Sequence, residues 1–228
     1  MATGITTTVL VKLYPIYPIL YPLLSSVFPN CLWSGNTQEK IAALTFDDGP
    51  HPRYTPDLLN VLDRHQVTAS FFWLGQCVRR SPEVAKQVRD RGHYIGLHGD
   101  DHRNFTHLNR DELRRSLERT QAAISDACGI DGGKIRDVRP PNGLFTPRTL
   151  QLLQQWHYRP VMWSVVPEDW TRPGVEVVVD RVLREVRSGS LIVLHDGNFG
   201  GPDVAETVDR LVPQLRDRGY RLVTIEQL

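Results

Sequence analysis

The sequence predicts an α/β fold in which about seven parallel strands alternate with the helices that cover them. Short β-rich runs recur from residue 41 onward, and segments with helical periodicity separate them. Over residues 39–228 one strand and one helix together take about 27 residues, a spacing typical of a (β/α) barrel. An open doubly wound sheet remains an alternative at this point. In both architectures functional residues lie at the carboxyl ends of the strands.

The expected strands are rich in β-branched, aromatic and aliphatic residues. They lie at 41–46, 67–72, 93–98, 135–139, 160–165, 191–195 and 220–225. The run at 191–194 contains four consecutive apolar residues, which indicates a strand buried on both faces.

Residue pairs at their starts mark several of the intervening helices. Thr55, Ser81 and Thr146 each precede a proline, and an N-cap followed by proline is typical of a helix start. Asn109 with Glu112 three residues later has the pattern of a capping box. We therefore expect a helix to begin at each of these four places.

Apolar spacing and glycines indicate the bodies and ends of other helices. Segments 110–127 and 203–217 each place apolar residues on one face. Two segments end in the sequence RDRG before a strand, and their glycines, Gly92 and Gly219, are expected to adopt the left-handed conformation that ends a helix.

Composition excludes some classes of function. The 228 residues are 40% hydrophobic and 23% charged, as in an ordinary globular protein. The net charge of +1 argues against a nucleic-acid partner, which requires a basic face. Cys31, Cys77 and Cys128 include no CxxC pair and cannot form a full disulfide framework, so we expect buried thiols.

Residues 1–38 form a charge-poor N-terminal arm ahead of the domain at 39–228, and Lys12 is the arm's only charged side chain. The uncharged stretch from residue 13 to residue 38 is long enough for a membrane span, but four prolines interrupt it. It also lacks the basic start and cleavage site of a signal peptide. Three alternatives remain: an arm packed on the domain, an uncleaved anchor or atypical export signal, or a membrane-surface segment with lipid contact through residues 13–33. The prolines are Pro15, Pro18, Pro22 and Pro29.

Ionisable side chains follow five of the expected strands. Each has an ordinary explanation when taken alone, since Asp-Gly-Pro is common in turns and two histidines four residues apart are usually solvated. Their joint placement at the carboxyl ends is unusual, because chance would scatter them over both ends. Together they supply metal ligands, a spare carboxylate, a histidine and an arginine, as in a hydrolytic metal site. The residues are Asp47, Asp48, His98, His102, Arg139, Asp169 and His195.

The order of the motifs TFDDGP, HxxxH, RPPNG, EDW and VLHD resembles that of the polysaccharide deacetylases of the NodB homology family, carbohydrate esterase family 4. The resemblance covers residues 41–228. It implies a distorted (β/α) barrel of about seven parallel strands. It also implies a divalent metal, with zinc as the first expectation and cobalt, nickel or manganese as alternatives.

By position, the resemblance implies that Asp48, His98 and His102 are the metal ligands. One carboxylate and two histidines leave coordination positions open for water and substrate, as a catalytic site requires.

The resemblance also implies roles in proton transfer. Asp47 is expected to be the general base and to pair with Arg139. His195 is expected to be the general acid that protonates the leaving group, and Asp169 to orient it.

Four positions are expected to contact substrate. Trp170 and Val193 are expected to line the acetyl-methyl pocket, and Pro141 and Asn142 to lie beside it. The backbone N–H near Asn142 is expected to contribute to the oxyanion site.

The sequence departs from the family pattern at four positions. Asn142 replaces an aromatic residue, Val166 replaces an acid and Val193 replaces a leucine. Gly99 replaces the Ser or Thr after the first histidine, so that a local hydrogen bond in this loop is lost. None of these four departures removes an expected metal ligand, base or acid. We expect them to affect substrate preference.

The expected function is metal-dependent removal of acetyl groups from an N-acetylglucosamine-containing polysaccharide, either peptidoglycan or a chitin-like oligosaccharide. One alternative is an O-acetyl esterase of the acetylxylan type, and another is a carbohydrate-binding relative without catalysis. The expected partner is therefore an acetylated glycan. The cell envelope is the expected location, although a cytoplasmic one stays open.

Overall fold

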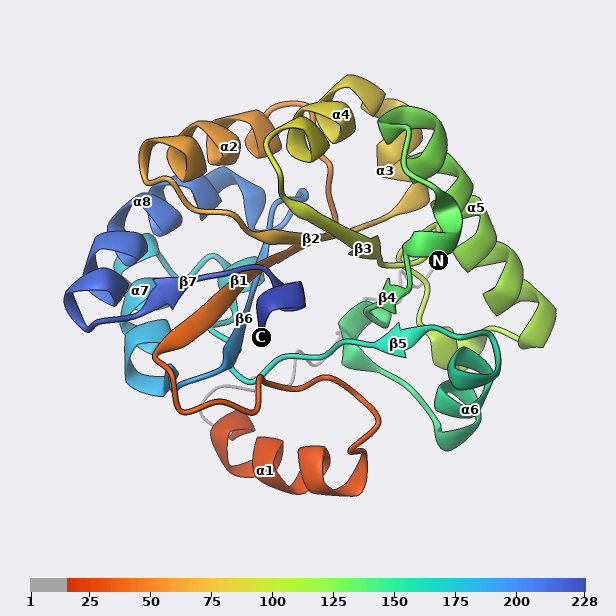
Figure 1. Cartoon of the computed structure of the whole chain (residues 1–228), viewed down its shortest axis with the longest axis horizontal. Helices are drawn as coiled ribbons and strands as arrows, with labels where there is room; N and C mark the ends of the chain where they lie inside the picture. Colours follow the sequence, from red (N-terminus) through yellow and green to blue (C-terminus); the bar gives the residue numbers. More distant parts are fainter. Residues whose placement is uncertain (1–15) are drawn as a thin grey trace, which may run out of the picture.

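The computed structural model describes residues 16–228, and its centre is a curled sheet of seven strands, a half-barrel with helices around it (Figure 1). The strand order is β5-β4-β3-β2-β1-β6, with β7 beside β1, and every pairing is parallel. The strands are β1 (Ile41–Asp47), β2 (Ser70–Trp73), β3 (Tyr94–Leu97), β4 (Asp137–Val138), β5 (Arg159–Pro160), β6 (Ser190–His195) and β7 (Arg221–Leu222).

Helices surround the sheet (Figure 1). The α-helices are α1 (Tyr17–Val27), α2 (Tyr54–Arg64), α3 (Gly75–Arg80), α4 (Pro82–Asp90), α5 (Arg110–Cys128), α6 (Pro147–Gln155), α7 (Val175–Glu185) and α8 (Gly201–Asp217). Short 3₁₀ turns are η1 (Phe105–His107), η2 (Gly132–Lys134), η3 (Pro141–Gly143), η4 (Asp169–Thr171) and η5 (Ile225–Gln227). The main hydrophobic core lies between the sheet and helices other than α1, whose residues belong to smaller clusters.

Every expected strand segment overlaps a strand, but β4, β5 and β7 are only two residues long, and β5 shares only Pro160 with the expected segment 160–165. The segment 160–165 changes partner along its length. Met162 N–H donates to the carbonyl of Leu32 at 2.7 Å, and Val165 N–H donates to that of Leu191 at 3.1 Å. The run of apolar residues therefore predicted burial correctly but overestimated the length of β5.

Residues from the N-terminal arm lie between β5 and β6, where the curled sheet is open. Leu32 N–H donates to Pro160 O at 2.8 Å, and Gly35 N–H donates to Gly189 O at the same distance. Ser34 forms an isolated antiparallel bridge with Ser190. The arm, together with the direct bridge between Val165 and Ile192, therefore links β5 to β6 and completes the ring.

Helix α1 packs against this side of the domain. Tyr17 is buried, and its hydroxyl donates to the carbonyl of Trp163 at 2.8 Å, while Tyr21 and Ser34 share a hydrogen bond of 2.7 Å. The expectation that prolines break the helix is wrong for Pro18 and Pro22. Pro18 is in the first turn, where no intrahelical N–H is needed, and Pro22 removes one bond from a helix that tertiary contacts stabilise.

The described helices include none that is long and apolar enough to cross a membrane. Lys12, Pro15 and the first three residues of the expected lipid-contact segment 13–33 lie outside the described residues. The division of the chain at residue 38 stays a prediction.

Two of the expected helix starts are confirmed by side-chain caps, and two are not. Asn109 and Thr146 both form capping boxes. Ser81 precedes α4 without a side-chain capping bond. The N-cap expected at Thr55 is wrong, because α2 begins one residue earlier and the Thr55 hydroxyl donates to Asp196 Oδ2 at 2.5 Å.

The expected glycine and cysteine roles largely agree with the structure. Gly92 and Gly219 have φ angles of 76° and 84°, in the left-handed region. The three cysteines are free; Cys31 and Cys128 are buried, whereas Cys77 is partly exposed.

Candidate active site

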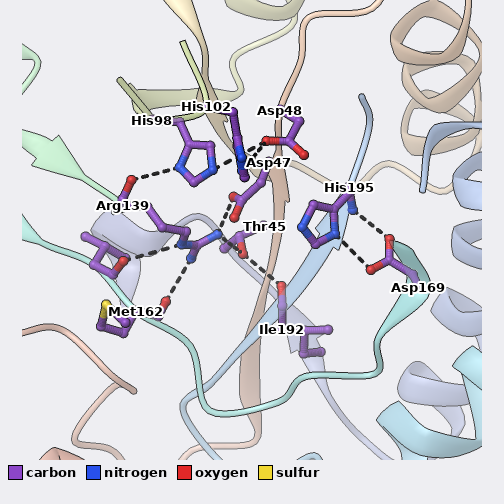
Figure 2. Close-up of polar contacts among 11 residues, drawn as sticks. Thr45, Asp47, Asp48, His98, His102, Arg139, Met162, Asp169, Ile192 and His195 are labelled. Carbon is purple, nitrogen blue, oxygen red and sulfur yellow. Dashed lines mark hydrogen bonds and ion pairs between the residues drawn. The ribbon is translucent and has the colours of Figure 1, made fainter. Parts of the chain in front are cut away.

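The site is built at the carboxyl ends of the central strands. Asp47 ends β1 and is the register partner of His195, which ends β6. His98 directly follows β3, and Arg139 directly follows β4. The parallel sheet therefore brings residues that are far apart in sequence to one edge (Figure 2).

Asp48, His98 and His102 form the candidate metal centre. Asp48 Oδ1 lies 3.4 Å from His98 Nε2 and 3.3 Å from His102 Nε2, and the three ligand atoms lie within 4.8 Å of one another. His98 Nδ1 donates to the Arg139 carbonyl at 2.7 Å, which leaves Nε2 free to act as a ligand. Figure 2 shows both rings turned toward the Asp48 carboxylate.

The Asp48 carboxylate has the electrostatics of a metal ligand. Burial disfavours its charged form, but the nearby imidazoles of His98, His195 and His102 outweigh burial and hold the pKa of Asp48 well below its usual range. Its Oδ1 atom is buried without a hydrogen-bond partner. An ionised, partnerless oxygen beside two imidazole nitrogens fits a divalent cation.

The turn that carries Asp48 packs against the residues that follow β6. Asp48 has a φ of 75°, which is uncommon for a residue with a side chain. A Cβ on Gly197 would lie only 2.5 Å from the Cβ of Asp48, so this close approach requires glycine. Asp196 is fully buried, and this burial raises its pKa to about 7. The Asp48 and Asp47 carboxylates also raise that pKa, whereas the hydrogen bond from Thr55 lowers it. Neither Asp196 nor Gly197 is among the site residues expected from the sequence.

Asp47 is held by a buried arginine. Arg139 Nη1 contacts Asp47 Oδ1 at 2.6 Å and Thr45 Oγ1 at 2.8 Å, and both charged side chains are almost fully buried. Arg139 Nη2 also donates to the Met162 carbonyl at 2.8 Å, and the guanidinium lies 4.1 Å from the centre of the Phe72 ring. These contacts leave the Asp47 carboxylate a single well-defined orientation.

His195 is oriented by Asp169. Its Nδ1 donates to Asp169 Oδ1 at 2.9 Å, and its backbone N–H donates to Asp169 Oδ2 at 2.7 Å. Burial disfavours protonation, but the Asp169 carboxylate, together with Asp48 and Asp47, raises the pKa of His195 to about 9. The Trp170 ring packs edge-on against the imidazole, with 5.2 Å between the ring centres.

A cavity of about 450 Å³ opens over these groups. Eight of its lining residues were expected from the sequence: Asp47, Asp48, His98, His102, Asn142, Trp170, Val193 and His195. Arg139 and Asp169 lie behind them as partners of Asp47 and His195. Pro141 is buried at the start of η3 and is not part of the lining.

Three further residues line the cavity, namely Trp163, Thr171 and Phe199. Trp163 lies outside all of the motifs found in the sequence. Phe199 is 69% exposed and lies in the glycine-rich loop after β6. An aromatic residue in a loop at a strand's carboxyl end was a signal that could have found it.

Two of the departures from the family pattern, Asn142 and Val193, line the cavity, whereas Val166 lies outside its lining. Asn142 has a left-handed backbone, with a φ of 56°, and its side chain donates to Asn104 Oδ1 at 2.6 Å. Val166 is fully buried in a cluster with Tyr17 and Val193. The position of the missing acid is thus filled by apolar packing that includes α1.

Comparison with known proteins agrees with this geometry. A family model described as polysaccharide deacetylase matches residues 34–161. The chain is 33% identical to a peptidoglycan-N-acetylglucosamine deacetylase of Bacillus cereus over 206 residues, covering 86% of this chain and 91% of the relative. It is 35% identical to a chitooligosaccharide deacetylase of Sinorhizobium fredii, covering 81% and 89%.

A solved structure shares the fold. The crystal structure of a peptidoglycan N-acetylglucosamine deacetylase superposes with a TM-score of 0.83 at 30% identity, covering 89% of this chain and 94% of that one. The fold expected from the resemblance, a distorted (β/α) barrel, is therefore confirmed. The motif order, the sheet and these similarities lead to one conclusion: the chain belongs to the polysaccharide deacetylase family.

Proposed function

We propose that this protein hydrolyses acetyl groups from N-acetylglucosamine units of a polysaccharide, either peptidoglycan or a chitin-like oligomer. The observation that carries the proposal is the pairing of Asp47 with His195 across neighbouring strands at the floor of one cavity. A carboxylate on one side and a protonated imidazole on the other are the base and the acid that amide hydrolysis needs.

Asp48, His98 and His102 would hold a divalent metal, and zinc is our first expectation from their nitrogen and oxygen donors. Such an ion, when bound, polarises the acetyl carbonyl and lowers the pKa of water.

Asp47 takes the proton from the attacking water in the proposed reaction. Its other contacts support this role, because Arg139 occupies Oδ1 and thereby orients the carboxylate toward the cavity. The water oxygen then forms the new bond to the acetyl carbon.

His195 protonates the leaving nitrogen. Its Nδ1–H is engaged by Asp169, so the proton that it can give is on Nε2. The C–N bond breaks, its electron pair stays on nitrogen with that proton, and acetate leaves. The raised pKa of His195 supports the protonated form at neutral pH.

The shape of the cavity supports an acetyl substituent. Trp163, Trp170 and Val193 supply apolar lining close to the ionisable residues. An acetyl methyl group can be buried against this lining while its carbonyl faces the candidate metal centre.

The test is acetate release from chitooligomers, from peptidoglycan and from acetylxylan, using metal-stripped protein to which different divalent ions are restored. We expect release from the N-acetylated glycans and its loss in Asp47→Asn. Faster release from acetylxylan would assign the site to an O-acetyl esterase. Glycan binding without release, insensitive to chelator and to Asp47→Asn, would assign the protein to the non-catalytic class.

We also propose that the protein works in the cell envelope and that α1 contacts a lipid surface. The outward face of α1 carries apolar side chains, with Ile19 exposed by 78%, Leu23 by 62% and Val27 by 57%. No charged side chain occurs from residue 13 to residue 38, and the inward tyrosine hydroxyls have partners. The exposed apolar side chains of such a helix can be buried in the interface of a bilayer.

Vesicle co-sedimentation tests this contact. The full chain is expected to bind phosphatidylcholine–phosphatidylglycerol vesicles, and the double variant Ile19→Glu, Leu23→Glu is expected to stay in solution. Val177→Glu, which changes an exposed apolar residue on α7, is the matched control and is expected to bind. Equal binding of all three proteins would contradict the proposal.

A further inference from the structure

The two histidine ligands are joined by a short loop that carries Gly99, Asp100 and Asp101. Gly99 has a φ of 89°, and a Cβ at this position would lie 3.1 Å from the Phe105 ring. The loop therefore cannot take the Ser or Thr side chain of the family pattern in this conformation without strain. Something other than that side chain must fix its shape.

Contacts from outside the loop fix its backbone. Gly75 N–H donates to the carbonyl of Gly99 at 3.0 Å, and Gln76 N–H donates to that of Asp100 at 2.9 Å. Asp100 N–H donates to the hydroxyl of Ser116 at 2.8 Å, and Ser116 is buried on α5. Helices α3 and α5 thus replace the missing contact within the loop.

The side chain of Asp100 strengthens this attachment. Its Oδ1 lies 2.7 Å from Arg79 Nη1, and its Oδ2 lies 3.9 Å from Arg119 Nη1. The carboxylate also lies against the Cα of Gly75, where a Cβ would be 2.5 Å from Oδ1. Only 16% of the Asp100 side chain is exposed, so its ion pair is shielded more than most surface pairs.

The two ligand histidines depend on the loop to different degrees. His98 is almost fully buried, and the Arg139 carbonyl fixes its ring. The His102 side chain is 38% exposed, and in residues 16–228 its only polar partner is Asp48. Its ring also packs beside that of His98, with 5.3 Å between the centres. The placement of His102 therefore rests on the loop backbone.

We propose that Asp100 is a positioning residue that holds His102 in reach of the metal through its contacts with Arg79 and Ser116. The inference rests on the proposed metal-dependent function. It assigns a role to a residue between the ligands that the motif itself leaves unspecified.

Metal affinity of the full chain is the measurement. Zinc affinity is measured by competition with a chelating dye, and the visible spectrum of the cobalt-loaded protein reports ligand geometry. Asp100→Asn is expected to weaken zinc binding by at least about tenfold, within the range of other residues that support ligands. The matched control is Asp101→Asn, which removes the same charge one residue away, where the side chain is 40% exposed and its ion pair within residues 16–228 is with Arg103.

Arg79→Gln is expected to reproduce part of the loss and leaves the loop sequence intact. It also replaces Asp100→Asn as the test if that variant fails to fold. Equal loss in Asp100→Asn and Asp101→Asn would overturn the proposal, because long-range charge alone would then explain the effect.

A double-mutant cycle with His102→Ala locates the effect. If Asp100 acts through His102, Asp100→Asn causes no further loss of affinity once His102 is absent. An undiminished loss in that background would also overturn the proposal. The proposed function is contradicted separately, by an unmodified protein that binds no metal or releases no acetate. The role of Asp100 is contradicted if the unmodified protein does both and Asp100→Asn has the same zinc affinity.

Discussion

Asp47 and His195 are register partners on the adjacent parallel strands β1 and β6. Neighbouring strands are about 4.8 Å apart, and both of these end at the same edge of the sheet. The backbone ladder therefore sets the separation of the proposed base and acid, with no loop between them. Arg139 then orients Asp47, and Asp169 orients His195, each from a different segment that follows a strand.

The buried pair of Arg139 and Asp47 predicts a large stability effect. Arg139→Met leaves the buried Asp47 carboxylate without its partner, and we expect the free energy of unfolding to fall by about 3–5 kcal/mol. Urea denaturation measures it. The control is Arg184→Gln, which removes an exposed pair with Asp180 and is expected to cost less than about 1 kcal/mol. Similar losses in the two variants would contradict the role of burial.

The contact of Asp169 with His195 predicts a pH effect. In metal-free protein, NMR titration of His195 is expected to give a pKa of about 9. Asp169→Asn is expected to lower that pKa, because burial is then opposed only by the Asp48 and Asp47 carboxylates. A pKa that does not change would show that Asp169 does not stabilise the imidazolium.

The sign of the stability effect follows from the same pKa. The pKa of His195 in the folded state lies above the unfolded value of about 6.5. Protonated His195 therefore stabilises the fold fully below pH about 6.5, and this stabilisation is lost as pH rises through about 9. Activity is expected to fall over the same alkaline range, because His195 must carry the proton that it donates. Denaturation and acetate-release profiles from pH 6 to 10, each compared with Asp169→Asn, check both expectations.

The contacts of the N-terminal arm predict that it is needed for folding. Removal of residues 1–38 is expected to give unstable or insoluble protein, because Leu32 and Ser34 then no longer fill the opening between β5 and β6. Removal of residues 1–15 leaves every contact described here in place, and we expect a folded product. Tyr17→Phe removes one buried hydrogen bond and is expected to cost about 1 kcal/mol. A fully stable protein lacking residues 1–38 would show that the arm is dispensable.

The exposed ring of Phe199 at the cavity predicts a role in glycan binding. Phe199→Ala is expected to raise KM for chitooligomers severalfold with little change in kcat, because the ring offers an apolar surface to the sugar. Phe199→Tyr keeps that surface and is expected to behave like the unmodified protein. Turnover of a small acetyl ester, which does not reach the rim, serves as the second control. Loss of kcat in Phe199→Ala would instead place the ring in the chemical step.

The carboxyl ends of the strands were predictable because function in parallel sheets gathers there, and Asp47, Asp48, His98, Arg139 and His195 all lie where that rule places them. Local patterns were less reliable where distant residues compete for the same atom. The Thr55 hydroxyl illustrates this, because Asp196, 141 residues away, accepts its hydrogen bond in place of the helix end.

Helix α1 shows a second limit of sequence reasoning. Its prolines argue against an isolated helix, and no local signal reveals that Tyr17 reaches the carbonyl of Trp163. Likewise, the loop sequence does not distinguish Asp100 from Asp101, because the contacts that set Asp100 apart come from Arg79 on α3 and Ser116 on α5. In both cases the deciding contact joins segments far apart in the chain.

The position of the arm between β5 and β6 also bears on how the protein is made. Residues 32–35 leave the ribosome early, yet their partners at 160–162 and 189–190 are synthesised more than 120 residues later. Domains generally fold as units during synthesis, so the apolar arm must wait for most of the domain to be synthesised before it can dock. Closure of the ring is therefore a late step, in which residues 32–35 reach their final place only after partners more than 120 residues further along the chain have been synthesised.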